Sequence, residues 1–112
     1  MKKYVDIIIR NNKTLLSDDL TFQMGNQIDL DVTLWRQPYY LIGRGIISRK
    51  LIPLEDEATL CIDENEIKSQ YGIFHIDTTN IVAGTHNCKI IWRDDNGYLF
   101  ITPKFNIKIE EE

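Results

Sequence analysis

Cysteine, long apolar runs and positive charge are all scarce in this chain of 112 residues. Two cysteines, Cys61 and Cys88, are too few for a disulfide framework, so we expect free thiols. No stretch approaches the roughly 18 apolar residues of a membrane span, and residues 1–13 lack the apolar run of a secretory signal. We therefore expect synthesis in a reducing cytoplasm and no membrane partner.

The charge balance is acidic, with 13 Lys and Arg against 17 Asp and Glu and a net charge of −4. Binding to the phosphate backbone needs a basic surface, so we expect no nucleic-acid partner. The chain is 43% hydrophobic and 27% charged, as ordinary globular proteins are. Its length predicts a single domain over residues 1–112.

The dominant period of the sequence is two. In "QIDLDVTL", the apolar residues Ile28, Leu30, Val32 and Leu34 alternate with polar ones, which predicts a strand with one buried face. The same reasoning predicts further strands at Tyr4–Ile9, Thr21–Met24, Tyr40–Ser48, Ala58–Ile62, Ile73–Asp77, Cys88–Arg93, Tyr98–Thr102 and Lys104–Ile109.

Turn residues separate these runs. Gly25-Asn26 and Asn96-Gly97 predict tight turns, the second of them within a hairpin. Pro103 has no N–H for a ladder bond and predicts a bulge or an unpaired edge position. Asp63 with Glu66 three residues later resembles a helix start, and Gly72 a helix end, so we expect one short helix between them.

The order of these features resembles the N-terminal immunoglobulin-like domain of phage baseplate upper proteins from phages of Gram-positive bacteria. The opening strand "MGNQIDLDVTL" and the closing stretch "VAGTHNCKIIWRDDNGYLFITPKFNIKIEEE" carry the resemblance. The matching residues are Gly25, Ile28, Leu30, Val32, Leu34, Ala83, Gly84, Ile90, Asp94, Asn96, Gly97, Thr102, Phe105, Ile107 and Ile109.

The resemblance implies an all-β fold, an immunoglobulin-like antiparallel β-sandwich of about seven to eight strands. It also implies a virion structural module that docks receptor-binding or tail components in a baseplate. The partners would be other baseplate or tail proteins, together with further copies of this chain, and the location would be the virion. Two alternatives stay open, namely a carbohydrate-binding module for host wall glycans and a small phage-encoded inhibitor of a host protein.

No residue pattern predicts a catalytic, cofactor or metal site, so we expect no enzyme. Cys88 beside His75 or His86 could pair a nucleophile with a base, but Cys88 lies in phase with apolar residues and is expected to be buried and inert. A disulfide to Cys61 stays open if their strands are neighbours. The spacing of Cys61, His75, His86 and Cys88 does not match a structural zinc site. Asp94, Asn96 and Gly97 begin like a calcium loop but lack its later Glu.

The segment "LWRQPYYLIGRG" holds the residue types that are enriched at interface cores. Its candidate interface residues are Trp35, Arg36, Tyr39, Tyr40 and Arg44. The arginines could pair with residues 55–57 of a neighbouring copy, and the aromatic residues could instead stack on a sugar or cover the core.

Overall fold

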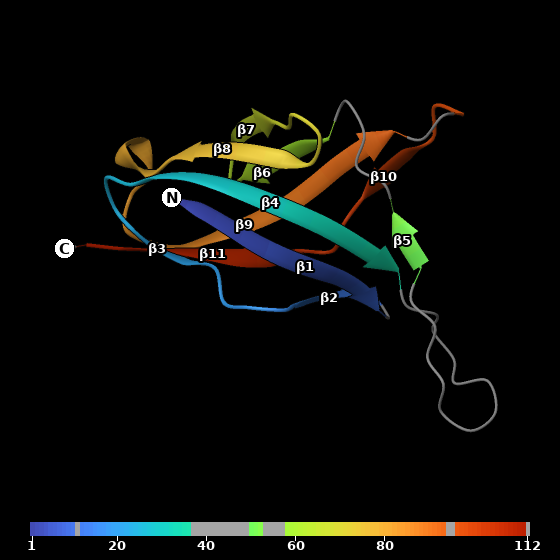
Figure 1. Ribbon diagram of the computed structural model, residues 1–112, viewed down its shortest axis with the longest axis horizontal. Helices are drawn as coiled ribbons and strands as arrows, with labels where there is room; N and C mark the ends of the chain where they lie inside the picture. Colours follow the sequence, from blue (N-terminus) through green and yellow to red (C-terminus); the bar gives the residue numbers. More distant parts are fainter. Residues whose placement is uncertain (11, 37–49, 53–57, 94–95, 112) are drawn as a thin grey trace, which may run out of the picture.

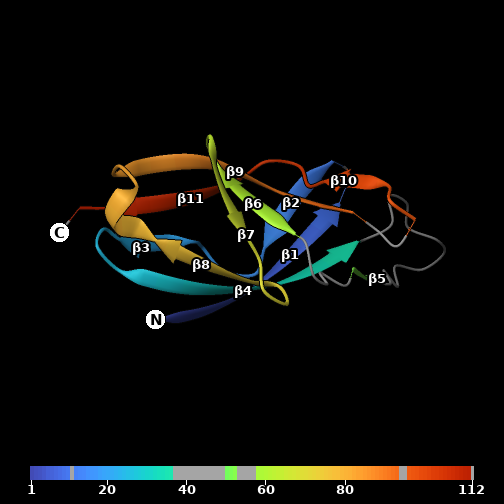
Figure 2. The same cartoon turned by 90° about the horizontal axis from the view of Figure 1, so that it is seen from above.

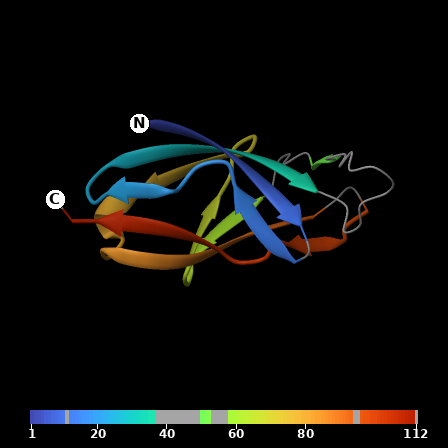
Figure 3. The same cartoon turned by 90° about the horizontal axis from the view of Figure 1, so that it is seen from below.

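The computed structural model describes residues 1–10, 12–36, 50–52, 58–93 and 96–111. These residues form two β-sheets that pack face to face as a sandwich, seen edge-on in Figures 2 and 3. The first sheet, here sheet A, contains β1 (Lys2–Arg10), β2 (Lys13–Leu16), β4 (Gln27–Arg36), β5 (Lys50–Ile52) and β8 (Ile73–Asp77). The second, sheet B, contains β3 (Thr21–Gln23), β6 (Thr59–Ile62), β7 (Asn65–Lys68), β9 (Gly84–Arg93), β10 (Leu99–Ile101) and β11 (Phe105–Glu110).

Strand β4 lies at the centre of sheet A and confirms the period-two prediction (Figure 1). Its four apolar residues from Ile28 to Leu34 are buried, while Asp29 and Asp31 face outward and are partly exposed. Buried aliphatic and aromatic side chains from both sheets pack against this row, among them Phe74, Ile90 and Ile107. Each such side chain contributes about 1.5–3 kcal/mol when it leaves water.

The strand order agrees with an immunoglobulin-like sandwich. Strands β6, β9 and β11 lie side by side in the order C-F-G with β7 beside β6 as C′, and β4 pairs with β8 as B with E. The predicted all-β sandwich is confirmed, with two differences in detail. The pairs β1–β4 and β3–β11 are parallel, so both sheets are mixed. The described residues also form more strands than expected, because β2, β5 and β7 are short additional ones.

The predicted helix after Asp63 is wrong. Residues Asn65–Lys68 form strand β7 instead, which turns back on β6 through Asp63 and Glu64. Asp63 has a positive φ of 52° and starts this tight turn rather than a helix. The only helical turn among the described residues is the 3-10 turn η1 (Thr78–Asn80). The strand expected at Tyr40–Ser48 lies outside the described residues.

The predicted hairpin near the end of the chain is confirmed, because β10 pairs antiparallel with the end of β9. Gly97 has the expected positive φ, at 83°. Pro103 lies between β10 and β11, at a bulge where residues 102–104 face only residues 89 and 90 of β9. The buried Thr102 bridges this bulge. Its N–H donates to Ile90 O and its Oγ1 accepts from Ile90 N, both at 2.9 Å.

Candidate functional site

The two candidate interface residues that the structure describes, Trp35 and Arg36, lie on opposite faces of sheet A. Trp35 faces outward from sheet A, is half-buried, and its Nε1 donates to Asp6 Oδ1 at 3.1 Å. Arg36, the next residue, points to the opposite face of the sheet, where its guanidinium lies 5.8 Å from the ring centroid of Phe100. Tyr39, Tyr40 and Arg44 lie outside the described residues.

Trp35 belongs to an apolar row that crosses the outer face of sheet A. The strand registers place Leu15 of β2 beside Ile8 of β1, and Ile8 beside Trp35 of β4. Leu15 is 47% exposed, whereas Ile8 is buried although it faces away from the core. We call Leu15, Ile8 and Trp35 the sheet A apolar row.

The same face is mostly polar from this row toward the first residues of β1 and β4. An exposed Tyr4 has the ammonium of Lys2 5.0 Å from its ring centroid. His75 Nδ1 lies 2.5 Å from Asp29 Oδ1. The charged and titratable side chains here are Lys2, Asp6, Asp29, Asp31, His75 and Asp77. Among the residues that the structure describes, four aspartates against one lysine make this part of the face acidic.

The outer face of sheet B has an apolar patch of its own at the β10 end. Leu99 and Ile101 are 51% and 52% exposed, and Ile101 pairs with the half-buried Ile91. We call Ile91, Leu99 and Ile101 the sheet B apolar patch, and Arg93 lies beside it, opposite Leu99. The described charged residues on the rest of this face are Lys68, Lys89, Lys108, Glu66 and Glu110.

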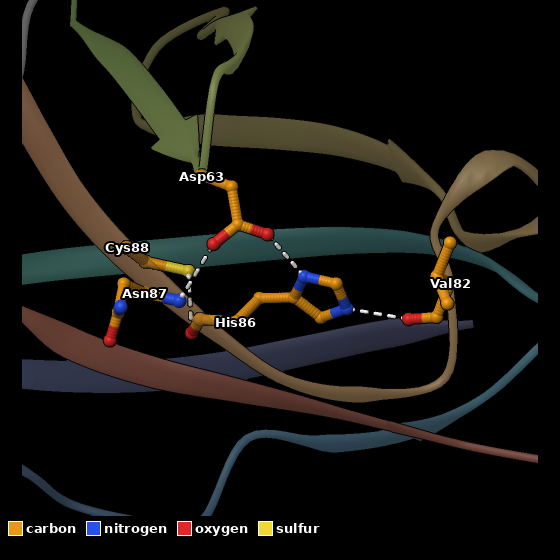
Figure 4. Close-up of polar contacts among 5 residues, drawn as sticks. All are labelled: Asp63, Val82, His86, Asn87 and Cys88. Carbon is orange, nitrogen blue, oxygen red and sulfur yellow. Dashed lines mark hydrogen bonds and ion pairs between the residues drawn. The ribbon is translucent and has the colours of Figure 1, made fainter.

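His86 of strand β9 makes polar contacts with Asp63 in the β6–β7 turn and with Val82 in the loop before β9 (Figure 4). His86 Nδ1 bonds to Asp63 Oδ2, and His86 Nε2 lies 2.5 Å from the carbonyl oxygen of Val82. A carbonyl oxygen only accepts, and so does an ionised carboxylate, so this arrangement favours the protonated ring, which donates from both nitrogens. The bond to Asp63 is the main cause that raises the pKa of His86, and the same bond lowers the pKa of Asp63.

Cys88 lies close to this pair, but the three residues do not form a nucleophile with its base. The Cys88 thiol contacts the backbone oxygen of His86 at 3.6 Å, not its ring, and both ring nitrogens are already engaged (Figure 4). Burial raises the pKa of Cys88 to about 12, so the thiol is protonated at neutral pH. The expectation of a buried thiol is confirmed.

Cys61 is buried as well, on the neighbouring strand β6. It pairs with Lys89, the residue after Cys88, and both thiols are free in the structure. The expectation of free cysteines is thus confirmed, and the disulfide left open by the sequence is not formed. No group of three or more His, Cys, Asp or Glu side chains in the described part of the chain could hold a metal ion. Asp94, the start of the calcium-like stretch, lies outside it.

The sequence did not single out Tyr4, Leu15 or the Asp63–His86 contact. The alternation of "KKYVDIII" could have placed Tyr4 on an outer face, because Val5 and Ile7 fix the inner one. Asp63 and His86 are 23 residues apart, and no local pattern links them.

No helix in the described part of the chain has the length and apolar character needed to cross a membrane. Comparison with protein-family models, curated proteins and solved structures finds no match to this chain.

Proposed function

We propose that this chain is a non-catalytic structural module of a phage virion, which docks components of a tail or baseplate through the outer faces of its sandwich. The baseplate resemblance of the sequence motivates the phage assignment. The docking surfaces are those of sheets A and B, and the partners are other tail or baseplate proteins and further copies of the chain.

The observation that carries this proposal is the apolar surface left on both outer faces. The core of the sandwich is filled by the inward-facing residues of the two sheets, so Leu15, Leu99 and Ile101 are not needed there and remain about half exposed. Exposed apolar residues that cluster, with polar residues around them, are typical of protein–protein contact sites.

The chemistry of the most reactive side chains supports a non-catalytic role. Cys88 is buried and protonated, and His86 uses both ring nitrogens to hold loops together. A general base needs a free ring nitrogen within reach of a proton. Assembly by shape and charge requires no such group.

Mass spectrometry of purified particles tests this proposal. We expect the chain to co-purify with tail proteins in particles of the phage that encodes it, and particles made without it to lack normal tails. Presence only in infected-cell lysate, with intact tails in its absence, would contradict the proposal and favour the inhibitor. Binding to host wall glycans on an array, without incorporation into particles, would favour the carbohydrate-binding module.

A further inference from the structure

The two outer faces of this sandwich complement each other, and each copy of the chain carries both. We propose that the outer face of sheet A of one copy docks on the outer face of sheet B of a second copy. This inference rests on the proposed function, because it names the partner and the contact surface for that assembly role.

The apolar parts of the two faces lie at the same end of the molecule. Strands β4 and β9 run in the same general direction in Figure 1, and their last residues lie towards β5 and β10. The sheet A apolar row includes Trp35 at the end of β4, and the sheet B apolar patch adjoins Arg93 at the end of β9. Two copies stacked in the same orientation would therefore place the row and the patch at the same end of their contact.

The charged parts of the two faces then meet as well, and their signs differ. On the described part of sheet A, four aspartates outnumber Lys2: Asp6, Asp29 and Asp31 lie on β1 and β4, and Asp77 lies on β8. On sheet B, three lysines (Lys68, Lys89 and Lys108) outnumber two glutamates among the described residues. The outward-facing bases Arg10 and Lys13 of sheet A lie beyond the apolar row, at the β1–β2 turn. Charge complementarity of this kind fixes the orientation of the two partners and is screened by salt.

The contact joins two different faces, so its symmetry is heterologous. Each docked pair keeps one unused sheet A face and one unused sheet B face. Heterologous contacts close into rings or extend into filaments, whereas a two-fold contact stops at a dimer. The wild-type chain should therefore not stop at a dimer as its concentration rises.

Sedimentation velocity of the full chain and of two charge-insertion variants tests the contact. Leu15→Lys places a charge in the docking surface of sheet A and leaves that of sheet B unchanged. Ile101→Lys places a charge in the docking surface of sheet B and leaves that of sheet A unchanged. Both residues are about half exposed, so we expect both variants to melt as the wild type does. Val82→Lys, at a residue that is 75% exposed and precedes β9, is the matched control.

We expect the mean mass of the wild type and of Val82→Lys to rise with concentration, and each disabled variant alone to stay monomeric. A one-to-one mixture of the disabled variants should form heterodimers and nothing larger, because one intact face remains on each. A wild type that remains monomeric up to about 1 mM, a concentration at which even a contact with a millimolar Kd would associate, would overturn the inference. So would a wild-type plateau at dimer, or a mixture that stays monomeric. If the chain is found in virions but does not self-associate in this test, self-stacking is refuted while the proposed function still holds.

Discussion

At the residue scale, His86 shows how a single side chain ties distant segments together. Its ring bridges the β6–β7 turn at Asp63 and the loop before β9 at Val82. The side chain is only 13% exposed, so the imidazolium depends on these acceptors for the hydrogen bonds that water would otherwise supply.

This bridge predicts a pH dependence of stability. Folding raises the pKa of His86 above its ordinary 6.5, so its contribution is complete below that pH and is lost as the pH rises through the folded-state pKa. We expect the melting temperature of the wild type to fall as the pH rises from 6.5 through the folded-state pKa of His86. His86→Gln should lose this decrease.

The exposed His75 provides the control. His75 and Asp29 side chains are 59% and 49% exposed, and exposed ion pairs contribute little to stability. His75→Gln should keep the wild-type melting temperature. An unchanged profile in His86→Gln would show that the bridge does not titrate in this way.

The thiols give a second prediction at this scale. Cys88 is 2% exposed with a pKa near 12, and the thiolate is the species that reacts with alkylating reagents. Labelling of the native protein should be slow and become fast on unfolding, and reductant should leave the melting temperature unchanged. Rapid labelling of the folded chain would contradict the buried, protonated thiol.

Core packing gives a third prediction. Leu30 is fully buried at the centre of β4, so Leu30→Ala should lower the free energy of unfolding by about 2–5 kcal/mol in denaturant titration. Thr33→Ala, on the outer face of the same strand, should change it by about 0.5 kcal/mol or less, as surface substitutions usually do. Equal losses in the two variants would contradict the assignment of faces.

At the scale of elements, alternation in the sequence was enough to predict the strands that line the core. The residues of β11, and those of β4 from Gln27 to Leu34, alternate regularly between apolar and polar, so their faces could be assigned without a structure. Strand β2 was missed because "KTLL" is short and has two adjacent leucines that face opposite sides.

The helix error has a different cause. Asp63 and Glu66 have the spacing of a helix cap, but the Asp63 carboxylate accepts from Asn87 N at 3.1 Å and pairs with His86. These partners lie on β9, and a sequence pattern cannot show that a cap residue will be used by a distant strand. Trp35 and Arg36 lie on opposite faces of sheet A because strand β4 continues through both residues. Their sequence pattern did not show where this strand would end.

The bulge at Thr102 gives a prediction for an element. The Thr102 hydroxyl is the partner of the buried Ile90 N–H, so Thr102→Val leaves that donor unsatisfied while keeping the side-chain shape. We expect a loss of about 1–3 kcal/mol in the free energy of unfolding by denaturant titration. Thr85→Val, on the exposed start of β9, is the control and should lose much less. A neutral Thr102→Val would mean that the N–H finds another partner at the bulge.

At the scale of the whole molecule, the proposed docking depends on two outer faces whose described residues differ in charge and whose apolar residues lie at the same end. The sequence could predict which residues alternate outward. It could not predict that Leu15, Ile8 and Trp35 come from three adjacent strands, because the parallel β1–β4 pairing has no local marker.

The most direct test of the central claim is incorporation into particles. Leu15→Lys and Ile101→Lys, supplied in place of the wild-type chain and checked for normal melting, should be lost from purified virions, whereas Val82→Lys should be retained. The amount of chain per particle is measured by quantitative mass spectrometry. Wild-type amounts of both disabled variants would contradict docking through the outer faces.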